Sequence, residues 1–426
     1  MEKPLRTQLS NLITVQNKMK ISRRIAASRP LATTAMHGRV EAFRNEGMGI
    51  IDFSIAISHF SPPAPVLDAV TRAVQEERTM PYTGVAGALD VRRSLCAKLE
   101  RENGIEAEAS DIIVTNGAKQ ALYEALYAMT DPGDSVLIFK PHWPAYVTTC
   151  QLLGLRPVLV DLPASITSEA LAALPKADLV IINNPHNPTG KVFDREELGH
   201  LARWIEAIGA QAIVDESYEH LSFGPVHISF ATLCDWRALG VVTLFSASQS
   251  YAMMGWRLGF ALAPAEIAGA MQTLQGPITA AASHLAQVAT VAAFDCGVQQ
   301  HMVEEYRERR DRVLRHLHEV PWLSMQCPDS GPYLWGDVRT LTHDTEAFAE
   351  GLLAEEGVAI MPGDALGVPG FIRIGYICDD VFTLMEGVRR LVAFGDRLAA
   401  RLGTDLATEP ATEPATEPAA DRAATR

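Results

Sequence analysis

The sequence predicts an α/β fold built on a large, doubly wound and mostly parallel sheet. Between about residues 60 and 290, short apolar runs rich in Val and Ile alternate with stretches of helical periodicity, such as 118–129 and 194–209. Such runs are typical of strands buried on both faces, and their alternation with helices indicates parallel pairing through crossovers. The expected strands are "DIIVTNG", "DSVLIF", "RPVLVDL", "ADLVIINN", "QAIVDES" and "VVTLFSAS".

The pattern changes near residue 296, which predicts a second, smaller α+β domain built from both termini. A long charged helix in "QQHMVEEYRERRDRVLRHLHEV" is followed by expected strands in "PYLWGDV" and "GFIRIGYI" and by a closing amphipathic helix. We expect an N-terminal arm at 1–50, a large domain at 51–295 and a small domain at 296–402. Residues 403–426 carry three ATEP units and are predicted to form a disordered tail.

The composition of the chain limits which binding partners and which cellular compartment are expected for it. The formal net charge of −14 argues against binding nucleic acid, because an acidic surface repels phosphate backbones. No run of 18 apolar residues predicts a membrane span, and the N-terminus lacks a signal-peptide pattern. The six cysteines are scattered without a CxxC pair, so neither a disulfide framework nor a metal site is expected. These features favour a cytoplasmic protein.

Polar and aromatic residues follow the predicted strands, at the edge where open α/β sheets bind ligands. "TNGAKQAL" turns through Gly117 into a helix whose N-terminus could hold an anion. Trp143 in "PHWPAY" offers a flat face, and Asn187 in "NNPHNPTG" offers an amide. Each also has an ordinary explanation: a connecting turn, a packed aromatic side chain or a common loop.

Two later strand ends carry charged groups. Asp215 in "VDESY" directly follows an apolar strand, and a buried carboxylate is costly unless it is paired, for example with a protonated ring nitrogen. Tyr218 follows three residues later. In "SASQSYAMMGWRLGF" the hydroxyls of Ser246 and Ser248 and the guanidinium of Arg257 suit an anionic phosphate.

Together these segments resemble the class I/II aminotransferases, which are fold type I pyridoxal-phosphate enzymes related to aspartate aminotransferase. The resemblance covers roughly residues 20–400. One segment alone is weak evidence, but seven in the family's order and approximate spacing are specific. They are "YTGVAG" (82–87), "TNGAKQAL", "PHWPAY", "NNPHNPTG", "DESY", "SASQSYAMMGWRLG" and "FIRIGY".

The resemblance implies a role for each residue. Asp215 would pair with the cofactor ring nitrogen, Trp143 would stack on the ring, and Asn187 and Tyr218 would bond the ring hydroxyl. The phosphate would be held by groups from two strand ends: Gly117, Ala118, Lys119, Ser246, Ser248 and Arg257. An amino-acid substrate would be bound by Arg373, at its α-carboxylate, with Ala56 and Asn187. Tyr82 would reach the phosphate in the neighbouring subunit, which implies a homodimer.

The main departure from the family pattern is Gln249, which stands where the family has the lysine that forms a Schiff base with the cofactor. A glutamine amide is neither a nucleophile nor a useful base at neutral pH, so pyridoxal 5′-phosphate is expected to bind non-covalently. Further departures near the substrate and subunit boundary are Ala56 for glycine, His59 for an acid, Ala281–Ala282 for Asn-Pro, and Pro332 for alanine.

Three interpretations of Gln249 remain open. The chain could be a Lys→Gln variant of an ordinary aminotransferase. It could be a natural lysine-less relative with altered chemistry, such as decarboxylation, elimination or oxidation, and the accompanying departures favour this second interpretation. It could also be an inactive cofactor-binding subunit of a hetero-oligomer. Replacement of the lysine function by another residue is less expected, and the groups considered are Lys119, Lys140, Lys191, His59 and His142.

Overall fold

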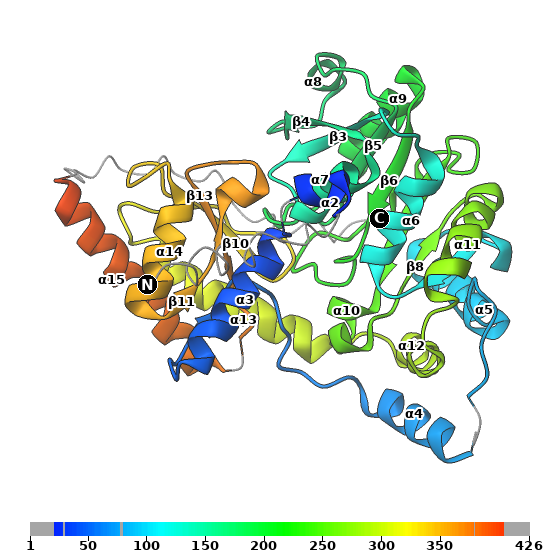
Figure 1. Cartoon of the computed structure of the whole chain (residues 1–426), viewed down its shortest axis with the longest axis horizontal. Helices are drawn as coiled ribbons and strands as arrows, with labels where there is room; N and C mark the ends of the chain where they lie inside the picture. The colour runs from blue at the N-terminus through cyan, green and yellow to red at the C-terminus, as the bar shows by residue number, and fades with distance from the viewer. Residues whose placement is uncertain (1–20, 29, 77–79, 379, 404–426) are drawn as a thin grey trace, which may run out of the picture.

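A computed structural model describes residues 21–28, 30–76, 80–378 and 380–403. Figure 1 shows two parts side by side, a larger one around a seven-stranded sheet and a smaller one around a four-stranded sheet. The α/β fold with a large, mostly parallel sheet is therefore confirmed. The domain boundaries remain predictions, and the ATEP segment lies outside the described residues.

The large sheet has the strand order β2-β8-β7-β6-β5-β3-β4. All six predicted strands are present, and β8 is an addition that runs antiparallel to both of its neighbours, β2 and β7. The four remaining pairings are parallel. The strands are β2 (Ile112–Thr115), β3 (Ser135–Lys140), β4 (Arg156–Asp161), β5 (Leu179–Asn183), β6 (Gln211–Asp215), β7 (Val241–Ser246) and β8 (Gly259–Leu262).

Helices cover both faces of this sheet. Along β6, Ala212 and Val214 join one hydrophobic cluster while Ile213 joins another, because alternate side chains of a strand point to opposite faces. The first cluster includes residues of α5, α9 and α12, and the second includes residues of α6, α7 and α11. The helices of this part are α4 (Ala64–Glu76), α5 (Leu89–Lys98), α6 (Ala118–Met129), α7 (Pro144–Leu153), α8 (Ser168–Ala172), α9 (Arg195–Ile208), α10 (Ala247–Ser250), α11 (Ala265–Thr279) and α12 (His284–Cys296).

The smaller part is built around an antiparallel sheet of order β12-β13-β10-β9. Met36 and Val40 of α3 join its hydrophobic cluster, and β1 pairs in parallel with β11, so residues before the large sheet pack with the C-terminal elements. The elements are α2 (Arg23–Ala27), α3 (Ala32–Asn45), β1 (Ile51–Asp52), α13 (Gln300–Leu317), β9 (Ser324–Met325), β10 (Tyr333–Asp337), α14 (Thr345–Glu356), β11 (Val358–Ala359), β12 (Met361–Pro362), β13 (Phe371–Gly375) and α15 (Val381–Leu402).

The described residues also include five short helical turns: η1 (Leu99–Asn103), η2 (Ala109–Asp111), η3 (Phe230–Thr232), η4 (Met254–Trp256) and η5 (Gly363–Leu366). Within the described ranges, none of the helices combines the length and apolar character needed to cross a bilayer. Among the same residues, His, Cys, Asp and Glu side chains nowhere gather in threes as a metal site would require.

Candidate active site

Gly259, the first residue of β8, brings two of the predicted strand ends together. It pairs with Thr115 of β2 on one side and with Ser246 of β7 on the other. A Cβ atom on Gly259 would lie 2.5 Å from the amide nitrogen of Ala118, so only glycine allows α6 to begin this close to the sheet. The unpredicted antiparallel strand therefore sets the spacing between the "TNGAKQAL" and "SASQSYAMMGWRLG" segments.

The N-terminus of α6 lies against the Arg257 guanidinium. Gly117 precedes α6 with a φ of +82°, and a Cβ there would lie 2.5 Å from Nη2 of Arg257. The guanidinium is held by bonds to the carbonyl oxygens of Met254 (2.9 Å) and Asn116 (3.4 Å). Exposed amides at a helix N-terminus and an adjacent guanidinium are both attractive to a phosphate.

Lys119 adds a second positive charge to this cradle. Its side chain stays partly exposed, yet desolvation and the neighbouring Arg257 charge lower the pKa of Lys119. The Lys119 Nζ lies 5.4 Å from the centre of the Trp143 ring. Ser246 Oγ accepts a hydrogen bond from the Ser248 amide (3.1 Å) and caps α10, and its hydroxyl hydrogen can still be donated to a ligand.

Asp215 ends β6 and is buried. Its carboxylate accepts hydrogen bonds from the Tyr146 hydroxyl (2.8 Å) and from the Ser217 hydroxyl (2.6 Å) and amide (3.1 Å). Burial raises the pKa of Asp215, and the bonds from Ser217 and Tyr146 oppose that rise. A cation beside this carboxylate would favour the ionised form.

Asn187, Tyr218 and Arg373 form one hydrogen-bonded group. Asn187 donates from Nδ2 to the Tyr218 hydroxyl (3.4 Å) and accepts at Oδ1 from Nη1 of Arg373 (3.1 Å). Arg373 is 1% exposed, donates from Nη2 to the carbonyl oxygen of Ser54 (2.7 Å), and packs 4.0 Å from the centre of the Tyr333 ring. Its Nε is buried without a partner.

Gln249 lies in α10, and its amide has one bonded and one unbonded end. Nε2 donates to the carbonyl oxygen of Ala56 at 3.3 Å, and Ala56 is itself buried. Oε1 is buried and has no hydrogen-bond partner. Ala56, which was predicted to lie beside the substrate, is therefore in direct contact with the Gln249 side chain.

Residues 49–384 match the family of class I and II aminotransferases. The chain belongs to this family. It is 31% identical over 396 residues to aspartate aminotransferase of Streptomyces avermitilis, covering 89% of this chain and 97% of that protein. It is also 31% identical over 409 residues to a bifunctional aspartate aminotransferase and glutamate/aspartate-prephenate aminotransferase of Petunia hybrida, covering 90% and 84%.

Solved aminotransferase structures share the fold. Aspartate aminotransferase of Thermus thermophilus with maleate superposes with a TM-score of 0.81 at 30% identity, covering 88% of this chain and 100% of that chain. Aspartate aminotransferase of Rhizobium meliloti gives a TM-score of 0.82 at 28% identity, covering 89% and 99%.

In this aminotransferase-family chain, the predicted site residue Tyr82 lies on the protein surface. It is 95% exposed, and two buried glutamines of neighbouring helices hold the loop that follows it. Gln275 donates to the carbonyl oxygen of Val85 (2.5 Å), and Gln287 accepts from the amide of Ala88 (2.8 Å). Tyr82 is therefore presented outward on an anchored loop.

Four of the five groups considered as replacements for a lysine have other partners. Lys140 pairs with Asp161 at 3.0 Å and Lys191 with Glu197 at 2.5 Å. His59 contacts Glu305 (3.0 Å) and Arg309 (3.2 Å). His142 lies 3.1 Å from the carbonyl oxygen of Trp143, and burial lowers its pKa.

The sequence interpretation missed several partners of these groups. Tyr146 and Ser217, which bond Asp215, lie inside the quoted segments "PHWPAY" and "DESY" but were assigned no role. Asn183 accepts from the Asn187 amide at 2.7 Å and donates to the carbonyl oxygen of Asp215 at 2.9 Å. Pro332 lines a narrow crevice with Asn187, Tyr218 and Tyr333, which places that departure beside the site.

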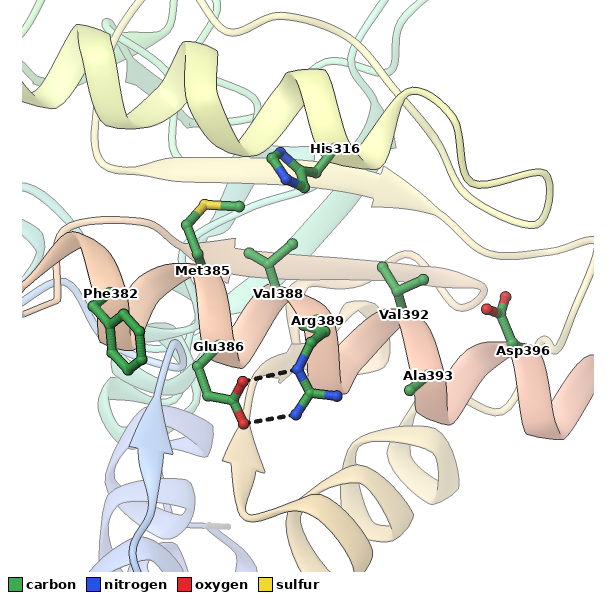
Figure 2. A pocket seen from close by; sticks show the side chains of 9 residues that line it. All are labelled: His316, Phe382, Met385, Glu386, Val388, Arg389, Val392, Ala393 and Asp396. Carbon is green, nitrogen blue, oxygen red and sulfur yellow. Dashed lines mark hydrogen bonds and ion pairs between the residues drawn. The ribbon is translucent and has the colours of Figure 1, made fainter.

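A wide surface groove of about 580 Å³ lies elsewhere, between α13 and α15. Figure 2 shows Phe382, Met385 and Val388 of α15 along it, His316 of α13 across from them, and the Glu386–Arg389 ion pair on α15. None of the predicted site residues lines this groove, so its size does not identify the site of chemistry.

Proposed function

We propose that this chain is a pyridoxal-phosphate-dependent aminotransferase-family enzyme that acts on an amino acid with a free α-carboxylate. In this proposal Gln249 occupies the position of the family's Schiff-base lysine, and the cofactor binds non-covalently. The observation that carries the proposal is that a buried carboxylate, a cationic helix N-terminus and a buried arginine come from strand ends and loops that the fold brings together.

The residues present fit this cofactor. Because Gly117 has no Cβ, the Arg257 guanidinium packs directly against the start of α6, and the helix N-terminus and the guanidinium together suit a phosphate. The buried Asp215 carboxylate, with its raised pKa, suits a protonated ring nitrogen. Arg373 Nε and Gln249 Oε1 are unpaired buried atoms that bound ligands would satisfy. Trp143 would stack on the ring, and Asn187 with Tyr218 would bond its hydroxyl.

When bound, pyridoxal phosphate supplies an electron sink for bonds at the substrate α-carbon. In the proposal Asp215 keeps the ring nitrogen protonated, and its bonds from Tyr146 and Ser217 hold the carboxylate in place. Ala118, Lys119, Ser246, Ser248 and Arg257 complete the phosphate site. Gln249 cannot move a proton at neutral pH, so a proton-transfer step needs another group or solvent.

Arg373 is proposed to bind the substrate α-carboxylate. Its guanidinium already bonds Asn187 Oδ1 and the carbonyl oxygen of Ser54, which fix its plane and leave Nε unpaired. A carboxylate is the group that a guanidinium fork recognises best. Ala56 and Asn187 would border the same substrate.

The proposal includes a homodimer with shared sites in the cytoplasm. Tyr82 is 95% exposed on its anchored loop, as a residue that reaches into a neighbouring subunit must be. Its target would be the phosphate bound by the partner.

Borohydride reduction tests the non-covalent cofactor. Protein saturated with pyridoxal phosphate is reduced, unfolded, digested and analysed by mass spectrometry. Because position 249 lacks an amine, we expect no peptide to retain the cofactor, while the Gln249→Lys variant treated identically should yield one labelled peptide containing residue 249. If the protein with Gln249 yields a labelled peptide containing Lys119, Lys140 or Lys191, another lysine bonds the cofactor.

The substrate class is tested by pairing amino acids with the matching decarboxylated amines. Amino acids should change the absorbance of the cofactor-loaded protein, whereas amines should give little change because they lack the group that Arg373 binds. Arg373→Lys should weaken the amino-acid response, since lysine keeps a charge but cannot bond a carboxylate at two points. Equal responses to both ligand classes would remove Arg373 from the substrate site.

A further inference from the structure

The Gln249 amide has a defined hydrogen-bonding polarity. Nε2 is 3.3 Å from the Ala56 carbonyl oxygen, which can only accept a hydrogen bond. Turning the amide over would place Oε1 against that carbonyl, acceptor against acceptor. The contact with Ala56 therefore fixes Nε2 as the bonded end and leaves Oε1 as the end without a partner.

Oε1 is a buried acceptor that lacks a donor. It is enclosed and has no hydrogen-bond partner among the described residues. Leaving such an acceptor unpaired is costly, and a bound ligand that brings an N–H group removes that cost. Two residues before Ala56, the carbonyl oxygen of Ser54 accepts a hydrogen bond from Arg373. Gln249 and Arg373 therefore both bond the backbone of the segment 54–56.

We propose that Gln249 Oε1 accepts a hydrogen bond from a protonated primary amine, and that this amine is carried by the aminated form of the cofactor, pyridoxamine 5′-phosphate. The inference rests on the proposed function for the location of the cofactor. An ammonium group donates hydrogen bonds to an amide oxygen, and a bond to a charged donor is stronger than a neutral one. The aldehyde form would present an oxygen, which cannot donate to Oε1.

The test compares three ligands that differ only at the carbon beside Gln249. Pyridoxamine 5′-phosphate carries an amine there, pyridoxal 5′-phosphate an aldehyde, and 4′-deoxypyridoxine 5′-phosphate a methyl group. Calorimetric titration of the full-length protein should give about tenfold or more tighter binding of the amine than of the methyl analogue. The aldehyde should also bind more weakly than the amine.

The matched control is Gln249→Met, which keeps the side-chain length and removes both polar ends. We expect the ratio of the amine and methyl dissociation constants to fall to within about twofold, because the acceptor is gone. A ratio measured on one protein cancels any general damage to the pocket. An unchanged ratio in Gln249→Met, or no preference for the amine ligand in the protein with Gln249, would overturn the inference.

Two outcomes separate this inference from the proposed function. Equal and tight binding of all three ligands by the protein with Gln249 would overturn the inference and leave the proposed function intact. Failure of all three ligands to bind would overturn both. A free amino acid also carries an ammonium group that could donate to Oε1. One further outcome is that Gln249→Met weakens L-alanine binding to protein loaded with the methyl analogue and leaves the ratio of the amine and methyl dissociation constants unchanged. In that case Oε1 accepts from the substrate ammonium group, and the assignment to pyridoxamine 5′-phosphate is wrong.

Discussion

Gln249→Lys is expected to create a covalent bond to bound pyridoxal phosphate and to change the rate of amino-group transfer more than the other variants described here. Lysine supplies both a nucleophile and a proton carrier, and general acid–base catalysis alone is worth about 10²–10⁴ in rate, or about 3–5 kcal/mol of barrier. The measurements are the absorbance spectrum and a keto-acid acceptor assay on the purified variant.

The two readouts distinguish the interpretations of residue 249. A Lys→Gln variant of an ordinary aminotransferase should regain both the covalent bond and transamination of a common amino acid. A natural lysine-less enzyme should regain the covalent bond alone, because Ala56 and Pro332 still shape a different pocket. Gln249→Met is the matched control and should regain neither. A lysine variant that forms no bond and has no activity would leave the inactive-subunit interpretation standing.

Asp215→Asn is expected to weaken cofactor binding by about 10- to 100-fold and to abolish activity. The asparagine side chain has the same shape, so the contact with Ser217 can persist while the negative charge is lost. Hydrogen bonds to charged partners contribute about 1.5–3 kcal/mol, which corresponds to this range of affinity. Calorimetric titration with pyridoxal phosphate measures the loss, and unchanged affinity would show that Asp215 does not pair with the ring.

Tyr146→Phe is the control that keeps the carboxylate and removes one of its bonds. The Tyr146 hydroxyl lowers the pKa of Asp215, so its removal should raise that pKa further. In this proposal cofactor binding requires the ionised Asp215 carboxylate, so the affinity should fall as pH decreases. The fall should begin at a higher pH in Tyr146→Phe than in the protein with Tyr146. In Asp215→Asn, where no carboxylate titrates at this position, cofactor affinity should lose the part of its pH dependence that comes from Asp215.

The sheet was largely predictable because four of its parallel strands, β3, β5, β6 and β7, are largely buried and appear as apolar runs. The partly exposed edge strand β4 still has an apolar run at 158–160. β8 was missed because its first two residues close the segment "SASQSYAMMGWRLGF", whose polar residues suggested chemistry. Its position between β2 and β7 depends on long-range pairing, as does the pairing of β1 with residues more than 300 positions later. Local periodicity cannot indicate such pairings.

The candidate site was predictable where residues share a strand end. Asn183 and Asp215 are direct partners in neighbouring strands, so the two segments that contain them had to meet. The contact between Gln249 and Ala56 joins residues 193 positions apart, and only the folded chain reveals the polarity that it gives the amide. The role of Tyr146 also required the structure, because a buried tyrosine beside tryptophan is equally consistent with simple packing.

The short helix α10 has an evolutionary consequence. Its start is capped by Ser246, and the amides of Tyr251 and Met253 bond the carbonyl oxygens of Ala247 and Ser248, so the backbone around position 249 is held by groups other than the side chain there. Glutamine and lysine codons differ by a single base. A lineage can therefore pass between the two residues in one mutational step while the fold is retained, and selection at this codon then acts on chemistry far more than on folding.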